Sequence, residues 1–445
     1  MKEFPFDPQR KKNSVLIKDG SKNILIVRGA PEEILKACVI DKKEKEKILQ
    51  LEADYGIEGK RSIAIAIREI KKDYYNKEDE NSKLKFISIT GFEDPIKEST
   101  IPAIKKAKEK GITIKIITGD GAEVAGAVGK KIGIIKDAGN VITGAIIDSI
   151  ENEIELELIC KNNNVFARCT PLHKYKIIKA LEKNNRVAFL GEGINDAPAL
   201  KAAHVGIVVK DASDIARDAA DIILLNKSLS VIIDGVDQGR AIIINISKYI
   251  KATLTSNFGN FYAIVFSTFF IKFLPMLPIQ ILLLNLLSDF PMMSIATDSV
   301  DKEETKYPSR FNMKEFAVSA TILGLVSTAF DLVFFFTFLP HGEKTLQTAW
   351  FIGSVLTELS LIYSIRTNKA FFKAKAPSKM IIIFTILAAA TTIILPLCGI
   401  EKLGFIKLNI YLYILIISIA LTYFACTEIA KIIYNKILNK NKAGL

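Results

Sequence analysis

The chain has 445 residues, enough for two or three domains, and its average composition hides a division between two halves. The first half is rich in Lys and Glu, whereas the second contains long apolar runs such as FYAIVFSTFFI and IIIFTILAAATTIIL, which are typical of a membrane protein. The formal net charge of +12 does not indicate a nucleic-acid partner, because Lys and Glu are interspersed in the first half and several basic residues flank the apolar runs.

The first 80 residues mix short strand-like runs with charged helical stretches. The strand-like runs are Val15–Ile17, Ile24–Val27 and Ser62–Ile67. We therefore expect a mixed α/β region here.

From about residue 84, short buried strands alternate with amphipathic helices. KFISITG, ITIKIITGD, VAFLGEG, HVGIVV and DIILL are apolar and bounded by Gly or Asp, and Ile101–Lys110 and Lys174–Lys183 lie between them. Because strands that alternate with helices form parallel sheets covered on both faces, we predict a doubly wound α/β domain with a parallel sheet.

After Asp234 the chain enters a helix and then a series of apolar segments. We predict six membrane spans, at about residues 250–271, 276–297, 317–339, 348–365, 380–399 and 410–431. Most are long enough to cross a hydrocarbon core of about 30 Å. The last four could instead be buried helices of a soluble domain, but little soluble chain remains to cover them.

Basic residues concentrate on one side of the predicted spans. Those after the fourth span are Arg366, Lys369, Lys373, Lys375 and Lys379, and more lie in the C-terminal tail. The positive-inside rule then predicts a multi-pass protein of the cell membrane with residues 1–235 and the C-terminus in the cytoplasm. The N-terminus has no apolar stretch and predicts no cleaved signal peptide.

Three short polar segments follow predicted strands, where open α/β sheets place their ligands. They are ITGD, ARCTPLHKYK and GEGINDAPAL, with the candidate residues Thr118, Gly119, Asp120, Lys174, Glu192, Asn195 and Asp196. Phosphoryl transfer needs a hydroxyl and amides for phosphate oxygens, a cation for the transferred charge and hard carboxylates for Mg²⁺. Each segment alone has an ordinary explanation as a turn, a surface Lys or a helix cap. Together, in this order and followed by membrane spans, they favour a phosphoryl-transfer site.

The first two predicted spans carry polar side chains at membrane depth, where such groups are costly and usually functional. Asn257 and Asn260 are expected on one helix face, as are Asn285, Ser288 and Asp289. All are oxygen-bearing groups, which suit Mg²⁺ or Ca²⁺ better than copper or zinc. The asparagines could alternatively join helices by hydrogen bonds. We interpret Asp289 as part of an ion pathway.

At this point the chain resembles a known family, the P-type ATPases. TGD, TPxxK and GEGINDAPAL are similar to the hallmarks of that family, and they occur in the family's order. Four earlier segments resemble its nucleotide-binding and hinge regions: FDPQRKKNSV, RGAPEEIL, GKRSIAIA and FEDPIKEST. The resemblance implies nucleotide-related roles for Phe6, Lys11, Arg28, Gly29, Arg61, Asp94 and Lys97. On the residues alone, Phe6 could equally be a core side chain, and Arg28 an exposed residue of a capping loop.

The resemblance also implies three regions and two cofactors. Residues 1–80 would be the C-terminal part of the nucleotide-binding domain, residues 81–235 a haloacid-dehalogenase-like phosphorylation domain, and residues 236–445 a transmembrane domain of six helices. ATP and Mg²⁺ are the implied cofactors, with Glu192 and Asp196 as the Mg²⁺ ligands.

Two departures from the family pattern affect the expected activity. The family's nucleophile, an Asp in a DKTGT segment, does not occur in these 445 residues, which predicts a fragment or a split pump whose separate N-terminal half carries it. Glu192 stands where the family has a Mg²⁺-binding Asp, and its extra methylene predicts impaired catalysis. An inactive membrane remnant or a regulatory half-pump is therefore the alternative to a working pump.

A narrower resemblance indicates the substrate. SNFGN, FLPMLPIQILLLNLL, ATDSVD and IRT look most like the magnesium-transporting branch, whose pathway residues map onto Asn257, Asn260, Asn285 and Asp289. The expected function is ATP-driven Mg²⁺ transport, with membrane lipid and the transported cation as partners and no nucleic acid. A pump for another hard cation, Ca²⁺ or H⁺, is the alternative.

Two further acids lie inside predicted spans. Glu358 in the fourth span is a further pathway candidate, with helix packing beside a polar neighbour as the alternative. Asp331 in the third span has no assigned role.

Overall fold

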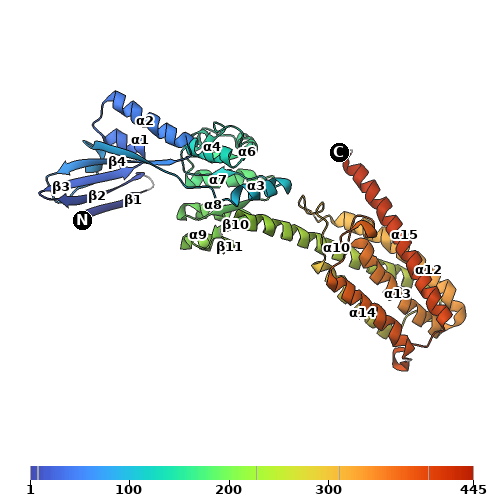
Figure 1. Ribbon diagram of the computed structural model, residues 1–445. Helices are drawn as coiled ribbons and strands as arrows, with labels where there is room; N and C mark the ends of the chain where they lie inside the picture. The colour runs from blue at the N-terminus through green and yellow to red at the C-terminus, as the bar shows by residue number, and fades with distance from the viewer. Residues whose placement is uncertain (1, 8–9, 227, 310, 399, 444–445) are drawn as a thin grey trace. The chain divides into compact units, whose positions relative to one another are not determined.

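The chain divides into two units, one ending at Ile233 (unit 1) and one beginning at Asp234 (unit 2). The computed structural model in Figure 1 describes residues 2–7, 10–226, 228–309, 311–398 and 400–443. Short 3-10 turns lie at Asp79–Asn81, Ile194–Asp196, Ser294–Thr297, Leu339–His341, Phe371–Lys373 and Glu401–Leu403.

An antiparallel sheet forms the first part of unit 1. Its strands pair in the order β1 (Lys2–Asp7), β2 (Lys12–Asp19), β3 (Lys22–Gly29), β4 (Arg61–Ile70) and β5 (Lys85–Phe92). Helices α1 (Pro31–Ala37) and α2 (Lys42–Ile57) pack against β4, and α1 also packs against β3. The three strand-like runs predicted before residue 80 are confirmed by β2, β3 and β4.

Strand β5 corrects one prediction. Its sequence KFISITG was expected among the parallel strands, but it pairs antiparallel with β4. Its exposure alternates along most of the strand, as in antiparallel sheets that bury one face, whereas a central parallel strand is buried on both. The apolar run alone does not reveal this difference.

Short parallel strands and helices form the rest of unit 1. One sheet has the order β6 (Ile116–Ile117), β8 (Val165–Ala167) and β7 (Ile142–Thr143), and the other has the order β11 (Ile222–Leu224), β10 (Val205–Val209) and β9 (Ala188–Gly191). The helices are α3 (Thr100–Glu109), α4 (Ala122–Lys131), α5 (Gly144–Asp148), α6 (Glu153–Asn162), α7 (Pro171–Glu182), α8 (Ala197–Ala202) and α9 (Asp214–Ala219).

These strands form two sheets where one doubly wound sheet was predicted. Helix α7 joins them, because Ile177 packs in the core around β8 and Ile178 packs in the core around β9 and β10. Ile117 of β6 contacts both cores, so β6 and β9 are the facing edge strands. β6 pairs only with β8, and β9 pairs only with β10, so within the described part of the chain each has one edge to which no strand is hydrogen-bonded.

Unit 2 is a helical bundle. Helix α10 (Leu229–Ser267) leads into it and is followed by α11 (Pro278–Met293), α12 (Met313–Phe338), α13 (Glu343–Ile365), α14 (Lys379–Leu397) and α15 (Ile410–Ala443). Helix α13 is central: it packs against α11, α12, α14 and α15 and is the most buried of them.

Five of the six predicted membrane spans are confirmed as helices long and apolar enough to cross a membrane. Among the described residues these are Pro278–Thr297, Met313–His341, Glu343–Ile365, Lys379–Leu397 and Ile410–Ile437. The first predicted span, residues 250–271, is not one of them. It falls on the last part of α10, where Lys251, Ser256 and Asn260 interrupt the apolar sequence and the helix ends at Ser267.

Candidate functional site

Thr118 and Asp120 form a small hydrogen-bonded turn directly after β6. Thr118 Oγ1 donates to Asp120 Oδ2 (2.8 Å) and accepts from the Asp120 backbone amide (3.1 Å). The Thr118 backbone amide donates to the carbonyl of Phe166 (2.9 Å), which fixes the turn to β8. Arg61 Nη2 also donates to Asp120 Oδ2, at 2.8 Å. A segment predicted for phosphoryl transfer and a segment predicted for nucleotide binding therefore lie together.

Lys174 and Asp196 form a largely buried ion pair at the end of β9. Lys174 Nζ donates to Asp196 Oδ1 (2.6 Å), and Asp196 Oδ2 accepts from the backbone amides of Glu192 and Gly193 (3.2 Å each). Burial opposes the charge of Asp196, but the Lys174 ammonium and the two amides outweigh it and lower the pKa of Asp196. The ionised carboxylate therefore holds both the glycine-rich loop and the Lys174 side chain in place.

The sequence TPLHK positions Lys174 on the first turn of α7. Thr170 caps the helix, because its Oγ1 accepts from the His173 backbone amide (3.3 Å), and Pro171 occupies the first helical position. A cap of this kind fixes where the helix begins and therefore which side chains its first turn presents.

Gly191, the last residue of β9, has no room for a side chain. A Cβ there would lie 2.7 Å from the Cβ of Asp196. We expect Gly191→Ala to lower the stability of this region by about 1–3 kcal/mol, because relief of the overlap moves Asp196 away from Lys174. Hydrogen exchange at residues 188–209 measures the effect.

Gly193→Ala is the matched control for this prediction. A Cβ at Gly193 would lie 3.8 Å from the nearest atom, which is an ordinary contact. Equal exchange in the two variants would contradict the steric explanation.

Glu192 and Asn195 project differently from Asp196. Both side chains are exposed, and Glu192 is anchored by its carbonyl, which accepts from the Ser213 amide (3.0 Å). In the described ranges, no three His, Cys, Asp or Glu residues are grouped closely enough to hold a metal ion. Roles for Glu192 and Asp196 in Mg²⁺ binding therefore stay predictions.

The residues assigned to nucleotide binding gather at one end of the antiparallel sheet. Neighbouring strands run in opposite directions, so the register places Asp7 opposite Lys12 and Lys12 opposite Gly29. The residues at this end are Phe6, Lys11, Arg28, Gly29 and Arg61. Phe6 is 63% exposed, which favours a free aromatic surface over a core position.

Close packing joins Lys11 to the Arg28–Gly29 turn. A Cβ on Gly29 would lie 2.4 Å from the Lys11 carbonyl, so only Gly fits this position. Arg28 Nε donates to Asn13 Oδ1 (2.9 Å), and Lys11 Nζ lies 3.5 Å from Glu32. The cationic groups are thus held at the sheet end by polar neighbours.

Asp94 and Lys97 lie in the segment between β5 and α3, and both side chains are exposed. This segment joins the antiparallel sheet to the parallel sheets. The location agrees with a hinge, and the nucleotide-related roles of both residues remain predictions.

A buried polar network beside the nucleotide residues was not predicted. Glu80 is fully buried and accepts hydrogen bonds from Arg10 Nη1 (2.5 Å) and the Ser14 hydroxyl. Ser14 also shares a hydrogen bond with Tyr75 (2.8 Å). The network ties the β1–β2 turn, which includes Lys11, to a distant loop.

In unit 2, Glu358 is the centre of a polar cluster between helices. Its Oε1 accepts from Ser256 Oγ (2.5 Å) and Asn260 Nδ2 (2.9 Å), both on α10. Helix α10 also packs closely against α12, where Gly259 faces Gly324. Asn260, a predicted pathway residue, therefore contacts Glu358, the further pathway candidate. Ser256 also belongs to this polar cluster and was not predicted from the sequence.

Three of the other predicted pathway residues are exposed in unit 2, and one is buried. Asn257, Asn285 and Asp289 are exposed, whereas Ser288 is buried. A shared pathway role for Asn257 and Asn260 therefore stays a prediction. Residues three apart differ by about 60° around a helix, and only Asn260 turns toward Glu358.

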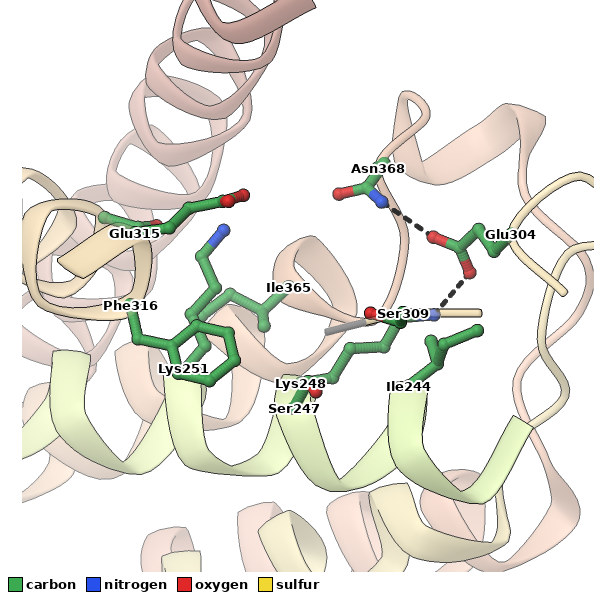
Figure 2. Close-up of a pocket in the computed structure, with 11 residues that line it drawn as sticks. Ile244, Ser247, Lys248, Lys251, Glu304, Ser309, Glu315, Phe316, Ile365 and Asn368 are labelled. Atoms are coloured by element: carbon green, nitrogen blue, oxygen red, sulfur yellow. Dashed lines mark hydrogen bonds and ion pairs between the residues drawn. The ribbon is translucent and has the colours of Figure 1, made fainter. Parts of the chain in front are cut away.

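A pocket of about 240 Å³ lies where α10 meets the beginning of α12 and the end of α13. Figure 2 shows Lys248 bound to Glu304, which in turn accepts from Asn368, while Lys251 extends toward Glu315. The Lys248 Nζ to Glu304 Oε2 distance is 2.8 Å. These contacts link the loop before α12 and the loop after α13 to α10.

Comparison with protein families matches two parts of the chain. Residues 1–99 match the P-type ATPase, cytoplasmic domain N, and residues 273–433 match the cation transporting ATPase, C-terminus. Both matches fall where the sequence predicted nucleotide-binding and membrane regions.

Individual relatives are similar over nearly the whole chain. Magnesium-transporting ATPase, P-type 1 of Escherichia coli (strain K12) is 35% identical over 458 residues, which cover 98% of this chain and 50% of that protein. Its counterpart in Salmonella typhimurium (strain LT2) is 34% identical with the same coverage. A calcium-transporting ATPase of Bacillus subtilis (strain 168) is 30% identical over 87% of this chain and 46% of that protein. The chain spans about half the length of these relatives.

Proposed function

Because this chain belongs to the P-type cation-transporting ATPases, as a C-terminal part, we propose that it takes part in ATP-driven transport of Mg²⁺ across a membrane. The observation that carries the proposal is the Lys174–Asp196 ion pair at the end of β9, on the side of unit 1 that also carries Thr118. The ion pair supplies a fixed cation after β9, and Thr118 supplies a hydroxyl directly after β6; phosphoryl transfer requires both groups.

Each residue of this site has a proposed task. Thr118 and the amides of its turn would bind phosphate oxygens, and Lys174 would stabilise the charge of the transferred group. Asp196 would keep Lys174 oriented, with Asn195 exposed beside it. Mg²⁺, when bound at Glu192 and Asp196, would neutralise phosphate charge.

The phosphorylated Asp would come from outside these 445 residues. We propose that its strand lies between β6 and β9 in a haloacid-dehalogenase-like sheet. Both strands are parallel edges, and Ile117 together with α7 joins their cores. A strand in this position would end between Thr118 and Lys174. A separate half carrying DKTGT is one source of such a strand.

ATP would bind at the end of the antiparallel sheet. Phe6 would stack on the base, and Lys11, Arg28 and Arg61 would contact the phosphates. The exposed ring and the three cations at one sheet end fit such a ligand. The Arg61–Asp120 contact would then join the nucleotide site to the phosphoryl-transfer site.

In the membrane, Glu358, Asn260 and Asp289 would form the pathway for the cation. The proposed path adds the last part of α10 as a sixth span and has unit 1 and the C-terminus in the cytoplasm. Hard oxygen ligands suit Mg²⁺ and also Ca²⁺. The similarity to a calcium-transporting ATPase keeps Ca²⁺ as the second candidate.

Transport by membrane vesicles tests the proposal. Mg²⁺-loaded vesicles that contain the chain with unit 1 facing outward and a polypeptide bearing DKTGT should release Mg²⁺ when ATP is added and form an acid-stable phosphoenzyme. Asp289→Asn should slow this release at least about tenfold, because the exposed acid of α11 loses its charge. Asp137→Asn, in an exposed loop of unit 1, is the charge-matched control. Phosphoenzyme without cation movement in either direction would contradict transport, and movement of Ca²⁺ alone would replace Mg²⁺ as the substrate.

A further inference from the structure

Asp331 is a buried acid on α12 that the proposed ion pathway does not use. Its side chain is 5% exposed, and Oδ1 accepts from Trp350 Nε1 of α13 at 2.8 Å. Its Oδ2 has no hydrogen-bond partner among the described residues. An ionised carboxylate with a single hydrogen bond in the apolar centre of a bundle is costly, whereas a carboxylic acid there is not.

A strip of incompletely bonded oxygens leads from Asp331 toward Glu358. Trp350, Ser354 and Glu358 are four residues apart and therefore lie along one side of α13, about 6 Å apart along its axis. Ser354 Oγ and Glu358 Oε2 are buried and, within the described ranges, also lack partners. Buried polar atoms without protein partners are uncommon, and buried water commonly supplies the missing hydrogen bonds of such atoms.

We propose that Asp331 is a proton-binding site and that the strip past Ser354 conducts its proton to and from the bundle centre. In the release step, the O–H bond at Oδ2 breaks, its electron pair stays on the carboxylate, and a water molecule accepts the proton. Trp350 remains hydrogen-bonded to Oδ1 and stabilises the charge that forms. The link to transport rests on the proposed function: a cation beside Glu358 favours release, so a proton is exchanged for the entering cation.

The titratable groups around the strip are few. Tyr423 of α15 packs against Phe330, next to Asp331, with ring centroids 5.5 Å apart. Glu358 and Asp289 lie toward the ion pathway, and α14 carries no titratable residue from Ile381 to Leu397. The charged side chains of the pocket in Figure 2 lie where α12 begins, whereas Asp331 is in the second half of that helix. Asp331 is therefore the acid that Trp350 senses directly.

Trp350 allows a direct test, because it is the only tryptophan of the chain. Its fluorescence is followed against pH in the purified chain in lipid nanodiscs, with selective excitation of tryptophan. Wild type should show a titration that Asp331→Asn abolishes and Glu358→Gln preserves. Glu343→Gln, at the exposed start of α13, controls for a general effect of acid substitution. A titration that survives in Asp331→Asn, or that disappears in Glu358→Gln alone, overturns the assignment.

Magnesium then separates the proton site from the proposed transport. Equilibrium dialysis measures whether Mg²⁺ binds to the chain. When Mg²⁺ binds, the midpoint of the Trp350 fluorescence titration should move to lower pH. Mg²⁺ that binds without moving the titration overturns the proton exchange. If Mg²⁺ does not bind while the Asp331-dependent titration persists, the proton site stands and the proposed function fails. Trp350→Phe should leave Mg²⁺ binding intact, which a merely structural role of the Asp331–Trp350 contact would not predict.

Discussion

Lys174→Met is expected to lower the local stability around the β9 loop by about 3 kcal/mol and to abolish phosphoenzyme formation. Removing one partner of a buried ion pair leaves the other charge uncompensated, and Asp196 would keep only its two backbone amide donors. Those amides should exchange with solvent about 100-fold faster than in wild type. Hydrogen exchange at Glu192 and Gly193 measures this change directly.

The pH dependence of this effect has a definite sign. The pKa of Asp196 is lowered in the folded state, so its stabilisation is complete above the ordinary Asp pKa of about 4 and is lost as pH falls through the lowered value. In Lys174→Met, burial raises the pKa of Asp196 without the opposing ammonium group, so the loss of stabilisation should occur at higher pH than in wild type. Exchange corrected for intrinsic rates between about pH 3 and pH 7 should show the displacement.

Two further variants isolate the ion pair. Lys176→Met removes another lysine of α7. The Lys176 side chain is 40% exposed and its Nζ lies 3.8 Å from Asp148 Oδ1, so its loss should change the exchange of the Glu192 and Gly193 amides little. Adding Asp196→Asn to Lys174→Met removes the uncompensated charge and should recover part of the lost protection. If the double variant were less protected than Lys174→Met, the charge explanation would be wrong.

The fold could be predicted where one segment fixes its own structure. HVGIVV forms β10, since a short apolar run buried on both faces suits a central strand. KFISITG looks similar, but its antiparallel pairing depends on β4, some twenty residues earlier, and no local pattern contains that information. The first predicted span stays a prediction, because polar residues interrupt the apolar sequence of α10 and some of them pack against another helix.

In the candidate site, too, residues with a local sequence signal could be predicted, and residues brought together by long-range contacts could not. TGD and GEGINDAPAL were found because Gly, Thr and Asp after a strand are a local signal. Glu80 was not found, since its partners Arg10 and Ser14 lie 70 and 66 residues away in a charged, polar context. The Ser256–Glu358 contact joins residues 102 apart. Contacts of this kind follow from packing, which the sequence pattern does not encode locally.

Glu358→Gln is the second variant for which we expect a large effect. Glutamine has the size of glutamate, and its Oε1 can still accept from Ser256 and Asn260, so the helices should stay packed. The negative charge is lost, however. We expect Mg²⁺ binding by the purified chain in nanodiscs, measured by equilibrium dialysis, to weaken at least about tenfold with little change in thermal stability.

Glu358→Ala distinguishes charge from packing at the same position. Alanine leaves the Ser256 and Asn260 donors without their acceptor in a buried cluster, at a cost of about 1–3 kcal/mol for each unsatisfied group. This variant should therefore lose both stability and Mg²⁺ binding, whereas Glu358→Gln loses binding alone. If the glutamine variant binds Mg²⁺ like wild type and only the alanine variant is impaired, Glu358 joins α10 to α13 as a packing residue. The ion pathway must then run along the exposed Asn285 and Asp289 face of α11 without it.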